Sequence, residues 1–246
     1  MKLRSLFLAL AVITFTASNG QNVDEILSKY FTNTGGLDKW KALKSRTSAG
    51  KAMMGPGQEF PFSVYEMAPN KQKFVINVQG TELIAQAYDG KDAWMLNPFA
   101  GGKDPVKMDD EQAKDVKDET FEDNFIDYGK KGHEVTLEGT EEIDGVKCFK
   151  LKLVRNKKNE KDDITEYHFF DSENFVPIVV ARYIRSGPQK GTEVRTYLSD
   201  YQEVGGLMFP FSMEQKVNGQ TGFKMTIEKI SLNDITDESI FAFPKK

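Results

Sequence analysis

The chain has 246 residues, with 33 basic and 37 acidic side chains and a formal net charge of −4 at pH 7. This mildly acidic balance argues against a nucleic acid partner, because proteins that follow phosphates carry a basic excess. The single cysteine, Cys148, cannot form a disulfide within the chain, so the sequence predicts a fold that depends on its hydrophobic core.

Residues 1–20 have the pattern of a secretory signal peptide. Lys2 and Arg4 precede an apolar run over residues 6–13, and a small and polar cluster follows at residues 16–20. The run is shorter than the roughly 20 residues that span a bilayer. Cleavage near Gly20 leaves a periplasmic protein with 31 basic and 37 acidic residues, a formal charge of −6. Because no cysteine lies beside this site, we expect that the protein is not itself lipidated.

Two helices are expected at the start of the mature chain. The first has the i, i+3, i+4, i+7 and i+8 apolar spacing of one helical face, at Val23, Ile26, Leu27, Tyr30 and Phe31. The Gly35-Gly36 pair predicts its end. A shorter pattern then predicts a second helix that packs in the same way, through Leu37, Trp40 and Leu43.

After these helices the apolar period changes to two, which indicates half-exposed antiparallel strands. About eleven or twelve strands are expected, with turn signals at roughly 10-residue spacing. Two segments interrupt the pattern. Residues 108–128 predict a polar helix whose apolar underside includes Phe121, Phe125 and Ile126, and the charged run at residues 155–163 predicts a solvated hairpin tip.

The pattern also constrains the architecture. A sheet of so many strands with one apolar face must either close or be covered. The expected helices are too few to cover it in flat form. We therefore predict a mainly β, α+β fold in which one strongly curved antiparallel sheet, an unclosed half-barrel, wraps around a hollow with helices at its mouth. No repeat or linker divides the sequence, and residues 21–246 are predicted to form a single domain.

The sequence contains no pattern typical of a catalytic, metal or cofactor site. His133 and His168 are the only histidines, and His133 lacks the second histidine of a zinc-binding H-E-x-x-H helix. A G-x-S-x-G turn and a dinucleotide-binding loop are absent as well. We therefore predict that the protein is not an enzyme. Carboxylates are plentiful, however, so a hydrolase that uses a carboxylate pair stays open as a minor alternative.

The most informative segment covers residues 88–99, with the sequence YDGKDAWMLNPF. Its Asp-Gly pair supplies the positive φ of a tight turn, so the segment alone predicts a hairpin with one buried tryptophan, Trp94. Together with Pro69-Asn70-Lys71 and Phe74 upstream, it resembles the core pattern of the LolA-like periplasmic carriers of outer-membrane lipoproteins.

This resemblance extends over most of the mature chain, because residues 201–210 and 237–241 are also similar to the second half of the family. It implies an unclosed β half-barrel with a helical lid, whose concave apolar face takes up the acyl chains of a lipoprotein or another lipid. It further implies a monomer without a cofactor, an inner-membrane donor complex and an outer-membrane receptor. The family holds its lid shut through an arginine on an early strand, and Arg46 is the positional candidate.

Alternation along the strands suggests which side chains line the hollow. The predicted cavity residues are Phe74, Trp94, Leu96, Phe99, Phe169, Phe209 and Phe211. The predicted lid residues are Phe121, Phe125 and Ile126, which would occupy the hollow in place of cargo and so permit its release. The principal alternative is an envelope protein-interaction module with a solid core, because residue types do not distinguish a filled interior from a hollow one.

Overall fold

A computed structural model describes residues 22–54, 57–100, 104–155, 163–185 and 187–244. The predicted signal peptide and residues 156–162 of the charged run lie outside these ranges. The run does connect two paired strands as expected, because Arg155 and Ile164 are partners in an antiparallel register.

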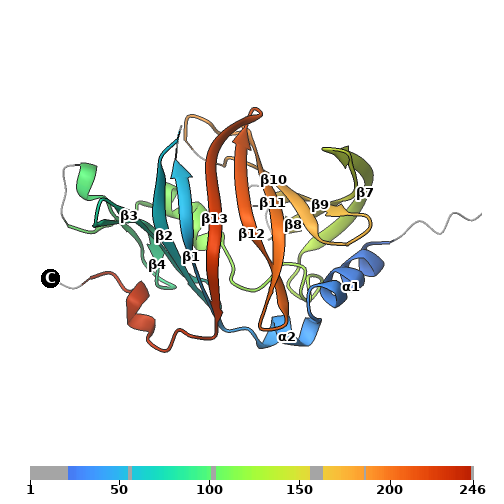
Figure 1. The fold of residues 1–246 in the computed structure, drawn as a ribbon, viewed down its shortest axis with the longest axis horizontal. Coiled ribbons are helices and arrows are strands. Elements are labelled where there is room, and N and C mark those ends of the chain that lie inside the picture. The colour runs from blue at the N-terminus through green and yellow to red at the C-terminus, as the bar shows by residue number, and fades with distance from the viewer. Residues whose placement is uncertain (1–21, 55–56, 101–103, 156–162, 186, 245–246) are drawn as a thin grey trace, which may run out of the picture.

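One antiparallel sheet of 13 strands dominates the fold (Figure 1). This exceeds the eleven or twelve strands expected, because a strand of two residues such as β6 gives no periodic signal. In chain order the strands are β1 Ser45–Met54, β2 Glu59–Met67, β3 Lys71–Val78, β4 Thr81–Tyr88, β5 Ala93–Leu96, β6 Val106–Lys107, β7 Glu134–Ile143, β8 Val146–Arg155, β9 Ile164–Asp171, β10 Pro177–Tyr183, β11 Glu193–Val204, β12 Leu207–Val217 and β13 Gln220–Leu232.

The order of strands across the sheet is β6-β5-β4-β3-β2-β1-β13-β12-β11-β10-β9-β8-β7. Two meanders are therefore joined in the middle, where β1 pairs with β13. The edges are β6 and β7, although these strands follow one another in the chain. Their connection must cross one whole face of the sheet, and in Figure 1 the green segment passes behind β13 and β12.

The helices of the described residues are α1 Val23–Asn33, α2 Leu37–Ala42 and α3 Asp110–Asp118, with 3-10 turns η1 Pro98–Ala100 and η2 Glu238–Phe241. The first two confirm the expected pair. Helix α1 begins where the Asn22 side chain accepts the Glu25 N–H. None of the helices in the described ranges is long and apolar enough to cross a membrane.

The helix expected over residues 108–128 is less than half as long as predicted, because α3 has 9 residues. It ends at Asp118, and Glu119 is already in an extended conformation. Beyond it, the Phe121 N–H donates to the Pro69 carbonyl at 3.0 Å instead of to a carbonyl within the helix. Contact with the β2–β3 turn thus ends the helix, and residues 119–133, which we name the strap, run on without regular structure.

The two faces of the sheet have different apolar clusters. We name the face that carries the two largest clusters the inner face, and Trp40 of α2 packs against both of them. Because side chains alternate along a strand, neighbours such as Phe74 and Val75 belong to different faces. The outer face has two smaller clusters, one around Phe169 and one around Trp94.

Candidate functional site

An apolar cavity of about 200 Å³ lies on the inner face, over the central strands. Its apolar lining comes from the four strands β2, β3, β12 and β13 and consists of Val64, Phe74, Phe209, Pro210, Met213, Met225, Ile227 and Ile230. Five polar side chains complete it, and these are Arg46, Ser48, Glu66, Gln72 and Gln86. The site is thus a small hollow with an apolar floor and one polar side.

The polar side is ordered by an ion pair between neighbouring strands. Arg46 of β1 donates from Nε to Glu66 Oε2 of β2 at 2.8 Å, and its Nη2 lies 2.6 Å from the same oxygen. The guanidinium also lies 5.5 Å from the ring centroid of Phe209. Among the described residues, Arg46 therefore forms its ion pair with Glu66 of β2, whereas the resemblance implied a contact with the lid.

The strap fills much of the remaining inner face. Phe121 packs against the cluster beside the apolar cavity, and Phe125 and Ile126 are buried in the cluster beneath α1. The Phe125 ring lies 4.8 Å from the His168 ring and 5.6 Å from the Phe170 ring. The three predicted lid residues therefore share the inner face, although an irregular segment and not a helix carries them.

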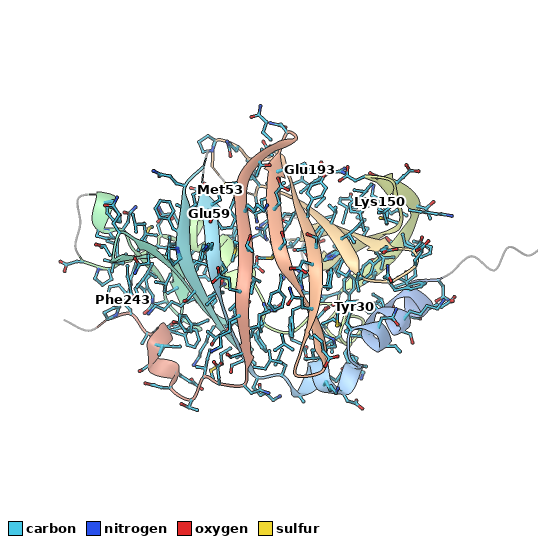
Figure 2. All side chains as sticks on the ribbon, in the orientation of Figure 1. Tyr30, Met53, Glu59, Lys150, Glu193 and Phe243 are labelled. Atoms are coloured by element: carbon cyan, nitrogen blue, oxygen red, sulfur yellow. The ribbon has the colours of Figure 1, made fainter. Side chains whose placement is uncertain are left out.

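Side chains of the first two helices hold the strap in place. The hydrogen bonds are Tyr30 to Asp123 at 2.7 Å, Lys41 to Asp127 at 2.8 Å and Tyr128 to Asp24 at 2.9 Å. Figure 2 shows Tyr30 where α1 meets the sheet. Burial and the Asp123 carboxylate raise the pKa of Tyr30 well above its usual value, so its hydroxyl keeps the proton that it donates.

A buried charged group lies beside the strap. Arg155 is 4% exposed and Glu166 is 8% exposed, and they form an ion pair of 3.3 Å. Burial raises the pKa of Glu166, but the hydrogen bond from His168 and the charges of His168, Arg155 and Arg182 outweigh it and lower the pKa to about 2. The expectation of a solvated tip is thus wrong for Arg155, because its side chain turns back onto the inner face.

No protein family profile and no curated protein matches this sequence. Solved structures do match its fold. A DUF1329 family protein from Desulfovibrio piger has a TM-score of 0.58 at 14% identity, with 91% of this chain and 98% of that chain covered. A LolA superfamily protein from Nitrosomonas europaea has a TM-score of 0.56 at 15% identity, with coverage of 91% and 98%. The chain has the LolA-like fold.

A candidate outer membrane lipoprotein-sorting domain from Vibrio parahaemolyticus shares this LolA-like fold, with a TM-score of 0.56, 12% identity and coverage of 88% and 94%. The family resemblance stated from residues 69–99 is thereby confirmed at the level of fold. The same holds for the predicted fold class, a single antiparallel sheet that does not close.

Three of the seven predicted cavity residues face the hollow of this LolA-like sheet. Phe74 and Phe209 line the apolar cavity, and Phe211 belongs to the same cluster. Phe169 does not, because it packs on the outer face with Cys148 and Val179. Its neighbour Phe170 occupies the inner face instead. Because Phe169 and Phe170 are adjacent on one strand and are both apolar, the alternation of side chains does not tell which of them faces the inner side of the sheet.

Trp94 and Leu96 also lie on the outer face, in a cluster that the C-terminal segment covers. The Trp94 Nε1 donates to the Phe241 carbonyl at 2.9 Å, and the ring centroids of Trp94 and Phe243 lie 6.0 Å apart. Figure 2 shows Phe243 far from Tyr30. Phe99 is 59% exposed in η1. The hairpin itself is confirmed, because β4 pairs with β5, but its aromatic residues do not line the cavity.

Several lining residues were not singled out from the sequence. Met213, Met225 and Ile227 share one face of β12 and β13, and their period of two was a signal that could have found them. Trp40, which the helical spacing had selected as a packing residue of α2, lies next to this lining. Its ring lies 5.2 Å from that of Phe209. Among the described residues, no group of three potential ligands could hold a metal ion.

Proposed function

We propose that this protein is a periplasmic carrier, which takes the acyl chain of a lipoprotein or another lipid into the inner face and passes it on to the outer membrane. The observation that carries the proposal is the strap. An irregular segment places Phe121 and Phe125 on the inner face beside an apolar cavity. Apolar side chains on a segment that is not part of the sheet are suited to exchange with apolar cargo.

The apolar cavity is too small to hold a long acyl chain while the strap is in place. Pockets for ligands of drug size measure about 300–1,000 Å³, whereas the apolar cavity measures about 200 Å³. A long acyl chain therefore fits only when the strap moves away. Each buried methylene contributes about 0.8 kcal/mol, so an open hollow would bind a chain too tightly for release. Competition from the strap lowers the net affinity and permits transfer.

The proposal also covers export, the oligomeric state, the partners and the lack of a catalytic role. The signal-like residues 1–20 support export, and the resemblance supports a monomer that receives cargo from an inner-membrane donor complex and delivers it to an outer-membrane receptor. Neither a cofactor nor a catalytic group is assigned. Glu166 is the buried carboxylate of the described inner face, and its lowered pKa is opposite to what a general acid requires.

The small volume of the cavity also favours a second candidate, an envelope protein-interaction module whose core is simply solid. In that case the strap is permanent and no lipid enters. Filling the cavity distinguishes the two functions.

The test compares two tryptophan substitutions on β13. Met225 lines the cavity, whereas Thr226 is exposed on the other face. In the exported protein, Met225→Trp is expected to lower the affinity for a fluorescent fatty acid by a factor of about 5 to 150, since filling a packed site costs about 1–3 kcal/mol. Thr226→Trp is expected to leave it unchanged. No uptake by the unaltered protein, with no lipid retained in native mass spectrometry of protein from its own envelope, would exclude the carrier role.

A further inference from the structure

A second cavity, of about 280 Å³, lies on the inner face between α3 and the strands β8 to β12, and we name it the polar cavity. Three arginines from the sheet side line it. They are Arg155 at the end of β8, Arg182 on β10 and Arg185 just beyond β10. These three guanidinium groups gather at one cavity although the chain as a whole has an acidic balance.

Most partners of these arginines belong to α3 and the strap. Arg155 Nη1 donates to the Asp118 carbonyl at 2.9 Å. Arg182 pairs with the Glu119 carboxylate at 3.1 Å. Arg185 pairs with Asp115 at 3.0 Å and with Asp118. The segment that crosses the inner face thus supplies carboxylates to the arginines as well as phenyl rings to the apolar clusters.

The balance of charge at the polar cavity depends on that segment. With the segment in place, the lining carboxylates outnumber the arginines. Without it, Asp163 and Glu166 are the carboxylates left beside the three arginines among the described lining residues, so this part of the site is cationic. Arg155 is also only 4% exposed, yet within the described ranges its Nε has no hydrogen-bond partner. A buried guanidinium with an unused donor is costly, and a further acceptor would stabilise it.

The polar and apolar cavities adjoin. Gln215 lines the polar cavity and Met213 lines the apolar one, and both project from the same face of β12. Two residues along a strand span about 7 Å. A small third cavity, lined by Glu119 and Phe121, shares Glu66 with the apolar cavity. The strap between Glu119 and Phe121 therefore covers the junction.

We propose that the polar cavity is a headgroup site, where Arg182 and Arg185 bind the anionic oxygens of an amphiphile whose acyl chain occupies the apolar cavity. The closed strap imitates this cargo, with the carboxylates of Asp118 and Glu119 in place of the headgroup and Phe121 in place of the chain. Arginine forks match phosphate and carboxylate oxygens. The inference rests on the proposed carrier function and assigns it a class of cargo, anionic lipids.

The test uses two probes with the same oleoyl chain, lysophosphatidic acid as the anionic probe and monooleoylglycerol as the neutral one. The exported protein is expected to bind the anionic probe at least about tenfold more tightly, as bonds between charged groups allow. Arg182→Gln combined with Arg185→Gln is expected to remove this preference, while the neutral probe binds at least as tightly as before because the change also deletes ion pairs that hold the segment. Binding of the neutral probe also reports that the variant is folded. Arg195→Gln is the control, since Arg195 lies on the outer face over Phe169.

A second variant keeps the arginines and removes their internal competitor. Asp118→Asn combined with Glu119→Gln is expected to tighten binding of the anionic probe severalfold. Inorganic phosphate at millimolar concentration is expected not to displace that probe, and displacement would indicate a site for free anions and overturn the assignment. Equal affinity of the unaltered protein for both probes, or a preference that survives in the arginine double variant, would also overturn it. Failure to bind either probe would instead reject the carrier function itself.

Discussion

The hydrogen bond from Tyr30 to Asp123 gives direct control over the strap. Removing the hydroxyl by Tyr30→Phe keeps the ring packed against Phe31 and Phe170 and deletes one bond of 2.7 Å that joins α1 to the strap. A hydrogen bond to a charged group contributes about 1.5–3 kcal/mol. The closed arrangement should therefore lose about a factor of 10 to 150 relative to the open one.

The apparent affinity of a ligand is its intrinsic affinity multiplied by the fraction of protein in the binding-competent state. As long as the open arrangement is rare, Tyr30→Phe should therefore tighten acyl binding by a similar factor while lowering the free energy of unfolding. Titration with a fluorescent fatty acid measures the first effect, and urea denaturation measures the second. A destabilising substitution that improves binding is not expected from a solid core.

Tyr201→Phe provides a matched control. The Tyr201 hydroxyl donates to the Pro177 carbonyl at 2.5 Å, so this change also deletes one tyrosine hydrogen bond, but the three hydrogen bonds that join the strap to α1 and α2 stay in place. It should lower stability by about 1 kcal/mol without tightening acyl binding. Equal affinity of the Tyr30 variant and the unaltered protein, or equal changes in both variants, would refute the view that the strap competes with cargo.

Three further results are expected. The pKa of Glu166 is lowered from 4.5 to about 2. The ionised carboxylate therefore contributes about 3 kcal/mol to the free energy of unfolding above about pH 4.5, and this contribution is lost as the pH falls toward 2. Urea unfolding across this pH range should show the loss, and Glu166→Gln should abolish this pH dependence. Burial raises the pKa of Cys148 to about 11. A thiol reagent at pH 8 should therefore label Cys148 only at the rate at which the protein unfolds. Rapid labelling of the native protein would contradict this prediction. A Cβ at Gly35 would lie 2.0 Å from the Gly206 carbonyl oxygen, whereas a Cβ at Gly36 would meet nothing within 4 Å. Because both glycines have positive φ, the strain of that conformation is shared, and thermal melts should show that Gly35→Ala destabilises the protein by several kcal/mol more than Gly36→Ala does. Equal losses of stability would disprove the clash.

Local patterns predicted most of the regular elements. The buried residues of α1 are the ones that its helical spacing selects, and the Asp-Gly turn at Gly90, with φ of +97°, joins two paired strands. These features depend on interactions within a few residues, so a single segment contains the information. The same reasoning failed for residues 119–128, where a bond to Pro69 from outside the segment ends the helix.

Alternation in a strand separates two faces but does not say which of them is concave. Phe169 and Trp94 were therefore assigned to the hollow, although they are among the most buried side chains of the outer face. The assignment of a face needs the curvature of the whole sheet. Phe74 and Phe209 do lie on the inner face, in the cluster that spans β1, β2, β3, β12 and β13.

The sequence by itself determined an antiparallel, mainly β chain that begins with an amphipathic helix, because periods of two and of 3.6 are properties of short segments. The tertiary structure alone decided what occupies the hollow. The pairing of β1 with β13 sends β6 and β7 to opposite edges, and their connection must then cross the inner face. That crossing brings Phe121 and Phe125 to the apolar clusters of the inner face. It also brings the carboxylates of Asp118 and Glu119 to arginines far away in the chain, and no local pattern contains a contact of that kind.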